Sequence, residues 1–192
     1  MLRYVLFPSL FPWILAVGTV PCVTGEDLPQ QIPRPIAEAQ LMIEQGRSLD
    51  ALTVLMPQVQ QDCPLDEAGR GIAWDIIGSA YRSLDRYDEA RRSFQTSAQI
   101  LSTLPSQRDQ TAATLNNLGG VEEATGNLDD AKNLRIKARR LYQETGNYAG
   151  VALTSNNLAN LALVQHDLSG ARKWEREAFD EAAIPSRSMP AI

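Results

Sequence analysis

Very few side chains in this chain are of the types that carry out covalent or metal chemistry. It has one histidine, His166, and two cysteines, Cys22 and Cys63. A zinc site needs about four ligands, so a zinc site built from Cys and His is nearly excluded. His166 stands beside Asp167 in a turn-like pair, which indicates a solvated histidine. Cys63 has no adjoining basic residue that would lower its pKa and make it a nucleophile.

Charged side chains occur in adjacent pairs, which raises the question of acid–base chemistry. The acidic pairs are Glu122-Glu123 and Asp129-Asp130, and the basic pairs are Arg91-Arg92 and Arg139-Arg140. Such pairs are typical of solvated helix faces and of charges near helix ends. No nucleophile motif, phosphate-binding loop or metal-ligand cluster is present in the sequence. We therefore expect a protein that is not an enzyme and that needs no cofactor.

The balance of charge argues against one class of partner. The formal net charge is −5 and the pI is about 4.9. Proteins that bind nucleic acid use a basic surface to neutralise phosphates. We therefore expect a protein or peptide partner and no nucleic acid.

The most informative feature is an internal repeat, which must position whatever site the chain has. Four related segments, GRSLDA, DRYDEA, GNLDDA and HDLSGA, end at alanines that lie 39, 41 and 40 residues apart. These are Ala51, Ala90, Ala131 and Ala171. Each segment opens with a turn-like pair, and each follows a helical pattern with a small residue in its course: Ala39, Gly78, Gly119 and Ala159. The repeat therefore predicts four units of helix A, a tight turn and helix B.

The small residues indicate how the two helices of a unit pack. Side chains larger than alanine at the closest approach would push the helix axes apart. Helix B shows apolar or small residues at three- to four-residue spacing, as in Ala131, Leu134, Ala138 and Leu141. No strand-like alternation of useful length is present. The fold class predicted is all-α.

One unit resembles the tetratricopeptide repeat signature. The matching residues are Trp74, Ile77, Gly78, Tyr81, Tyr87, Ala90 and Phe94, and Ser97 stands where that family favours alanine. The units TLNNLGGVEEATGNLDDA and TSNNLANLALVQHDLSGA resemble the longer repeats of kinesin light chains. The resemblance covers residues 36–182 and implies a right-handed solenoid of about four hairpins. It is weaker in the first unit, where Glu38 replaces a leucine and Pro57 is expected to interrupt helix B.

The resemblance implies which residues line the concave groove, since five positions of each helix A face it in that family. They are Ile72, Asp75, Ser79, Arg82 and Ser83, then Ala113, Asn116, Gly120, Glu123 and Ala124, then Leu153, Asn156, Asn160, Leu163 and Val164. Carboxamides can pair with a peptide backbone. The candidate peptide-binding residues are Arg82, Asn116, Glu123, Asn156 and Asn160. The alternative is that asparagines brace neighbouring helices, which we favour for Asn117 and Asn157. Asp75 stands where a carboxylate-clamp lysine is expected, so that activity is not inferred.

The N-terminus is typical of a secretory signal peptide. Arg3 precedes an apolar stretch that ends in small residues before Glu26. We expect cleavage after residue 25, which removes Cys22 and leaves no intramolecular disulfide, and a secreted or periplasmic protein. An uncleaved membrane anchor is the alternative, and a lipoprotein signal at Cys22 is weaker. Residues 26–35 are rich in proline and indicate a linker.

The sequence leaves two classes of function open. The first is an adaptor that binds a protein or peptide through the concave groove. The second is a structural subunit of an envelope or export assembly that is held through the ends of the array. Residues 183–192 indicate a short tail. We expect Leu163, Trp174, Ala178 and Phe179 to be less buried than their equivalents, so that Trp174 and Phe179 mark an end that docks a partner or a second copy. The alternative is that the tail folds back and partly shields this end.

Overall fold

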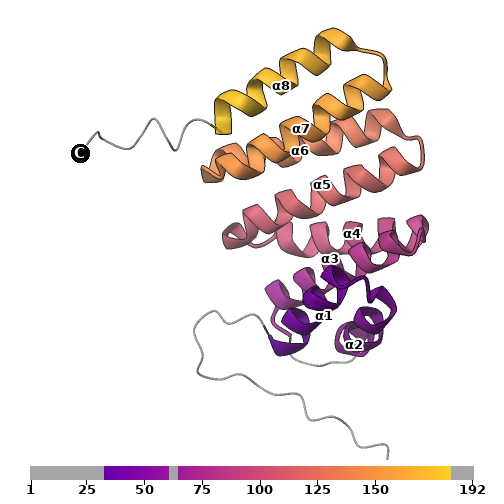
Figure 1. Ribbon diagram of the computed structural model, residues 1–192. Coiled ribbons are helices and arrows are strands. Elements are labelled where there is room, and N and C mark those ends of the chain that lie inside the picture. The colour runs from indigo at the N-terminus through magenta and orange to yellow at the C-terminus, as the bar shows by residue number, and fades with distance from the viewer. Residues whose placement is uncertain (1–32, 61–64, 183–192) are drawn as a thin grey trace, which may run out of the picture.

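The computed structural model describes residues 33–60 and 65–182. Within these ranges the chain forms α-helices, one 3-10 turn and no strand, which confirms the all-α prediction (Figure 1). The helices are α1 (Arg34–Glu44), α2 (Ser48–Gln60), α3 (Glu67–Ser83), α4 (Tyr87–Ser102), α5 (Arg108–Ala124), α6 (Leu128–Thr145), α7 (Tyr148–Val164) and α8 (Leu168–Ala182), with η1 (Pro105–Gln107) before α5. The predicted signal peptide, Cys63 and the tail lie outside the described residues.

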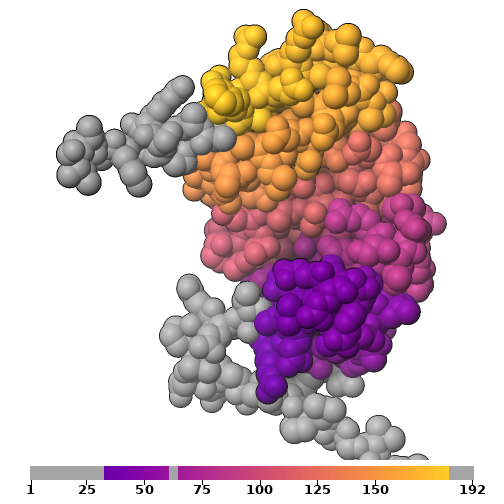
Figure 2. Space-filling view, viewed as in Figure 1, coloured from indigo at the N-terminus to yellow at the C-terminus, as the bar shows by residue number. Residues whose placement is uncertain are grey.

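The helices pair into four hairpins that stack along one direction. The hairpins α1–α2, α3–α4, α5–α6 and α7–α8 contact each other in order, mainly through α2 with α3, α4 with α5 and α6 with α7. Figure 2 shows the hairpins as successive bands, with the indigo first hairpin and the yellow α8 at opposite ends of the stack. The predicted solenoid of four helical hairpins is confirmed.

The turn inside each hairpin falls at the predicted pair. Gly46, Asp85, Gly126 and His166 all have a left-handed backbone, with φ between 56° and 83°. The next residue in each turn donates its N–H to a carbonyl five residues earlier, as Arg86 does to Tyr81 over 2.9 Å. This pattern ends a helix and satisfies its last carbonyls. Glycine, aspartate and histidine tolerate the left-handed region better than most residues, so this repeated local signal was readable from sequence.

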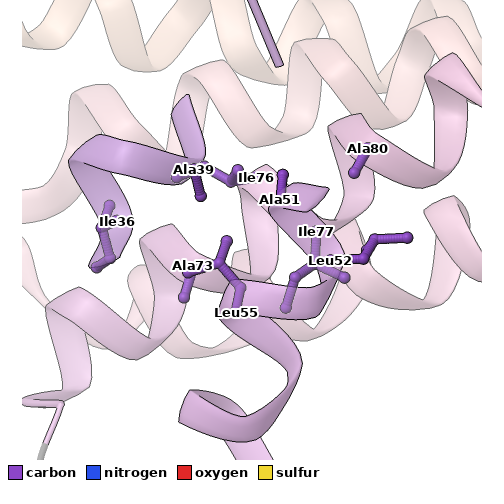
Figure 3. Packing of buried hydrophobic residues seen from close by; sticks show 9 residues of the cluster. All are labelled: Ile36, Ala39, Ala51, Leu52, Leu55, Ala73, Ile76, Ile77 and Ala80. Carbon is purple, nitrogen blue, oxygen red and sulfur yellow. The ribbon is translucent and has the colours of Figure 1, made fainter. Parts of the chain in front are cut away.

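Small residues lie where the two helices of a hairpin come closest. A Cβ added at Gly78 would lie 2.8 Å from the Phe94 ring, and one at Gly119 would lie 3.1 Å from Cγ of Arg135. The eight small residues of the repeat are all buried, in keeping with their predicted role. In the first hairpin, Ala39 and Ala51 join a cluster with Ile36 and the α3 residue Ile77 (Figure 3). The hairpins therefore share continuous apolar contacts.

Two helix boundaries differ from the sequence predictions. Helix α1 begins at Arg34, so the last two residues of the expected linker are helical; Pro33 precedes the helix and Pro35 lies in its first turn, where proline fits. The predicted interruption at Pro57 is wrong, because α2 continues to Gln60. Pro57 has no N–H to donate to the carbonyl of Thr53, four residues earlier. Both residues are exposed, so water can satisfy that carbonyl. In the part of the chain that the structure describes, no helix is long and apolar enough to cross a bilayer.

Candidate protein-binding surface

The mapped groove positions of helix A differ in exposure along the array. In α3 and α5 the first four positions are half-buried, and only the last, Ser83 or Ala124, is exposed. In α7 all five positions are exposed: Leu153, Asn156, Asn160, Leu163 and Val164. The exposed fractions of the three apolar members are 54%, 45% and 53%. The face of α7 is therefore the most open part of the mapped groove.

Neighbouring A helices are joined by hydrogen bonds that explain this difference. The side-chain amide of Asn117 on α5 donates to Asp75 on α3 over 3.4 Å, and that of Asn157 on α7 donates to Asn116 on α5 over 2.9 Å. Asp75 and Asn116 each lie three residues before the small residue of their helix, and their donors lie two before theirs. The two hydrogen bonds therefore join equivalent positions in successive repeats. Asn117 and Asn157 brace the helices, as favoured from sequence.

Asp75 does not present a free carboxylate in the groove. Burial raises the pKa of its carboxyl above the usual range, while hydrogen bonds from Thr114 and Asn117 and the charge of Arg82 act in the opposite direction. Arg82 lies close to α5, since a Cβ added at Gly120 would be 3.4 Å from its Nη1. Arg82 and Asp75 thus line the contact between α3 and α5.

Glu123 and Asn116 are also engaged in contacts between helices. A 2.6 Å ion pair joins Glu123 to Arg135 of α6, and Arg135 Nη1 donates to the backbone carbonyl of Asn157. Arg135 is 5% exposed and so links α5, α6 and α7 from a buried position. Of the five candidate residues, Asn156 and Asn160 alone are exposed, and neither has a hydrogen-bond partner among the described residues. The structure brings these two together on α7.

Sequence reasoning missed Arg135, although a signal was present. Arg135 lies four residues after Ala131 and three before Ala138, both of which are buried on the inner face of α6. A charged residue in that register must be paired when it is buried. The facing glycine, Gly119, leaves space for its side chain.

Three of the four charged pairs contain a residue that is not solvated as predicted, and in the first two of these pairs Arg91 and Glu122 contact each other. Arg91 Nε donates to Glu122 over 2.6 Å, and only 9% of the Glu122 side chain is exposed. The hydrogen bond from Arg91 lowers the pKa of Glu122 below its usual value. The contact joins α4 to α5, so the expected solvated glutamate is wrong for Glu122. Arg92 is exposed, as predicted.

In the third of these pairs, Arg139 is the residue that is not solvated. Its side chain is 15% exposed; Nε donates to Ser155 of α7 over 2.9 Å, and Nη2 lies 2.9 Å from Glu177 of α8. Its guanidinium lies 5.5 Å from the centre of the Trp174 ring. Arg139 therefore joins three helices, while the neighbouring Arg140 is exposed as predicted. Asp129 and Asp130 are exposed in the first turn of α6, also as predicted.

The C-terminal end of the array is only partly uncovered. Phe179 is 74% exposed, which makes it the most exposed of the large apolar side chains described. Trp174 is half-buried, like its equivalent Leu134, and Ala178 is buried, like its equivalent Ala138. The expectation of lower burial is therefore wrong for these two, because both pack within the stack. Of the four residues expected to be open, Leu163 and Phe179 are exposed.

Other features do not suggest a chemical site. Among the described residues, no group of three or more His, Cys, Asp and Glu side chains could hold a metal ion. A hollow of about 380 Å³ lies between α4, η1, α5 and α6, and none of the five candidate residues lines it. The arrangement of exposed amides and apolar side chains on α7 is suited to contact with another chain.

Comparisons with known proteins agree with this architecture. A tetratricopeptide repeat family model matches residues 70–134 and 110–180, which together cover more than half of the chain. No curated protein shows significant similarity. The crystal structure of BtubC (BKLC) from P. vanneervenii is similar, with a TM-score of 0.66, 19% identity, 76% of this chain covered and 60% of that one. The chain thus spans 60% of that protein's length. A Podosopora anserina protein with nearly identical TPR-like repeats of the kinesin-light-chain type has a TM-score of 0.49 and 16% identity, with 80% and 96% covered.

Proposed function

Because the chain belongs to the tetratricopeptide repeat family, we propose that it is a non-catalytic adaptor that binds a protein partner through the concave face of its array, outside the cytoplasm. Members of this fold present extended concave surfaces built from successive repeats. The contact region we assign is the face of α7 that carries Leu153, Asn156, Asn160, Leu163 and Val164. Arg82, Asn116 and Glu123 support the neighbouring helices.

The observation that carries this proposal is the exposure of α7. Its two amides lie between apolar side chains along one face, whereas most of the equivalent residues of α3 and α5 are partly covered. Exposed apolar groups together with unpaired amides offer both apolar contact and hydrogen bonds to a partner. A solvated helix face carries mainly charged and polar residues, whereas three of these five residues are apolar and none is charged.

Action outside the cytoplasm rests on the N-terminal segment alone. Its order of positive charge, apolar stretch and small residues is that of an export signal. Sequencing the N-terminus of protein recovered outside the cytoplasm should find Glu26 first. A full-length product embedded in the membrane would replace this proposal with an anchored protein.

The binding claim is tested with a partner recovered by co-purification from the native host. Replacing both Asn156 and Asn160 with alanine should weaken binding and leave the circular dichroism spectrum unchanged. The matched control is the double replacement of Asn133 and Gln143, which are exposed on α6. If the α7 variant binds as tightly as the wild type, the contact region is elsewhere.

A second candidate function is a structural subunit held through the end of the array. The exposure of Phe179, at 74%, is the observation that favours it. Recovery of the chain only within a large assembly, with a Phe179→Ser variant lost from that assembly, would support this role over the adaptor.

A further inference from the structure

The side-chain hydrogen bond that repeats between successive A helices has no counterpart at Asn156 among the described residues. Asp75 accepts from Asn117, Asn116 accepts from Asn157, and Asn156 is the next residue in the same register. Each acceptor lies three residues before the small residue of its helix, and Ala159 is that residue in α7. On α3 and α5 the acceptor is covered by the following A helix. No described helix follows α8 (Figure 1). Asn156 is exposed.

We propose that the open end of the array, formed by α7 and α8, binds an α-helix of a partner protein that lies there as α7 lies on α5 and α6. A carboxamide on that helix donates a hydrogen bond to Asn156. This inference rests on the proposed adaptor function and names the form in which the partner is recognised. The helix is the occupant because the equivalent faces of the same molecule are covered by helices.

The chemistry of the partner helix follows from the α6 residues that contact α7. Arg139 of α6 donates a hydrogen bond to Ser155 of α7, which lies two residues before the donor Asn157. The equivalent of Arg139 in α8 is Phe179, since each lies eight residues after the repeat alanine of its helix. The partner therefore carries an apolar residue in place of Ser155 and an asparagine or glutamine two positions later.

Charge adds a second requirement. Arg135 accompanies Asn157 in the α5–α7 contact, and its equivalent in α8 is Glu175, which is exposed. A carboxylate cannot donate to a backbone carbonyl as Arg135 does, and it favours a positive charge nearby. The partner helix thus carries a basic side chain close to its carboxamide.

A second copy of this chain fits the end less well. The A helix at the other end of the array is α1, and the residue in the register of Asn157 is Ala37. Alanine has no side-chain donor, so head-to-tail stacking of two copies leaves Asn156 without a partner. Between α1 and α3, the equivalent acceptor and donor positions are occupied by Ile36 and Ile76, which are both buried.

The test uses the full chain and a defined helical probe. The probe is a stapled, fluorescent peptide of residues 148–164 that carries Ser155→Leu and a lysine placed one turn after Asn157. Fluorescence anisotropy measures its binding to the wild type and to Asn156→Leu, Phe179→Ser and Asn133→Leu chains, of which the last is the control. A second probe also carries Asn157→Leu.

We expect the first probe to bind the wild-type chain. Replacing either Asn156 of the chain or Asn157 of the probe with leucine should weaken binding by up to roughly tenfold. Combining the two changes should weaken binding no further than one alone, since the same contact is lost. Phe179→Ser should also weaken binding, and Asn133→Leu, at an exposed position of α6, should not. Additive losses, or an equal loss for Asn133→Leu, would overturn the assigned pair.

Three further results would overturn this inference in different ways. If the probe does not bind while extended peptides do, the adaptor function stands and helix recognition fails. If sedimentation shows a dimer that Asn156→Leu dissociates, a second copy occupies the face. If the wild-type chain binds no protein at all, the proposed adaptor function is contradicted as well.

Discussion

The side-chain amide of Asn157 donates a hydrogen bond to Asn116 over 2.9 Å and so joins α7 to α5. The adjacent Asn156 has an identical side chain but is exposed, and the described residues offer it no partner. Two neighbouring asparagines of one motif therefore have separate roles, one within the array and one at its surface.

This difference predicts opposite effects on stability. Asn157→Ala removes the donor to Asn116 and should lower the free energy of unfolding by about 0.5–1.5 kcal/mol. Asn156→Ala, the matched control, should change it by less than about 0.5 kcal/mol because it breaks no internal contact. Urea denaturation followed by circular dichroism measures both. Equal losses in the two variants would show that Asn156 also has a structural partner.

Close packing at the repeat alanines gives the second prediction. Ala131 is fully buried where α6 meets α5, so Ala131→Leu should destabilise the fold by about 1–3 kcal/mol through overpacking. Asn133→Leu adds a similar side chain at an exposed position of the same helix, and it should have little effect. Thermal melts compare the two. An unchanged transition for Ala131→Leu would contradict the repeat register.

The contact between Arg91 and Glu122 predicts a pH dependence. The hydrogen bond from Arg91 lowers the pKa of Glu122 from its usual value of 4.5. A lowered folded-state pKa stabilises the protein above the unfolded value, and this contribution is lost as pH falls through the folded value. Glu122→Gln should therefore destabilise the chain at neutral pH by about 1.5–3 kcal/mol, with a smaller difference in acid.

The control for this prediction is Glu144→Gln. Glu144 pairs with Arg140, whose side chain is 80% exposed, so the pair should contribute little. Urea unfolding at a series of pH values measures each variant against the wild type. A difference for Glu122→Gln that stays constant with pH would contradict the lowered pKa.

The repeat was predictable from sequence because its signals are local. Two signals mark each unit: a left-handed turn and a small residue in the preceding helix. Both depend only on the residues themselves and their near neighbours. The turns are at Gly46, Asp85, Gly126 and His166. The period then follows from matching these signals along the chain. For the same reason the positions of the hairpins agree with the prediction.

The partners of the charged residues were not predictable in the same way. Arg91 meets Glu122 across 31 positions of sequence, and Arg139 meets Ser155 and Glu177 on two other helices. Periodicity places a residue on a helix but does not give the rotation of the helix that packs against it. Similarly, the shared motif could not separate Asn116, which is braced, from Asn156, which is exposed.

The central claim is that the face of α7 contacts a partner protein. Its most direct test is photo-crosslinking in the producing cells, with a photoreactive residue at Leu153 of α7 or at Ile136 of α6. These positions are apolar and similarly exposed, at 54% and 41%. The account predicts a discrete protein adduct from position 153 and none from position 136. An adduct from position 136 alone, or the same adduct from both, would contradict it.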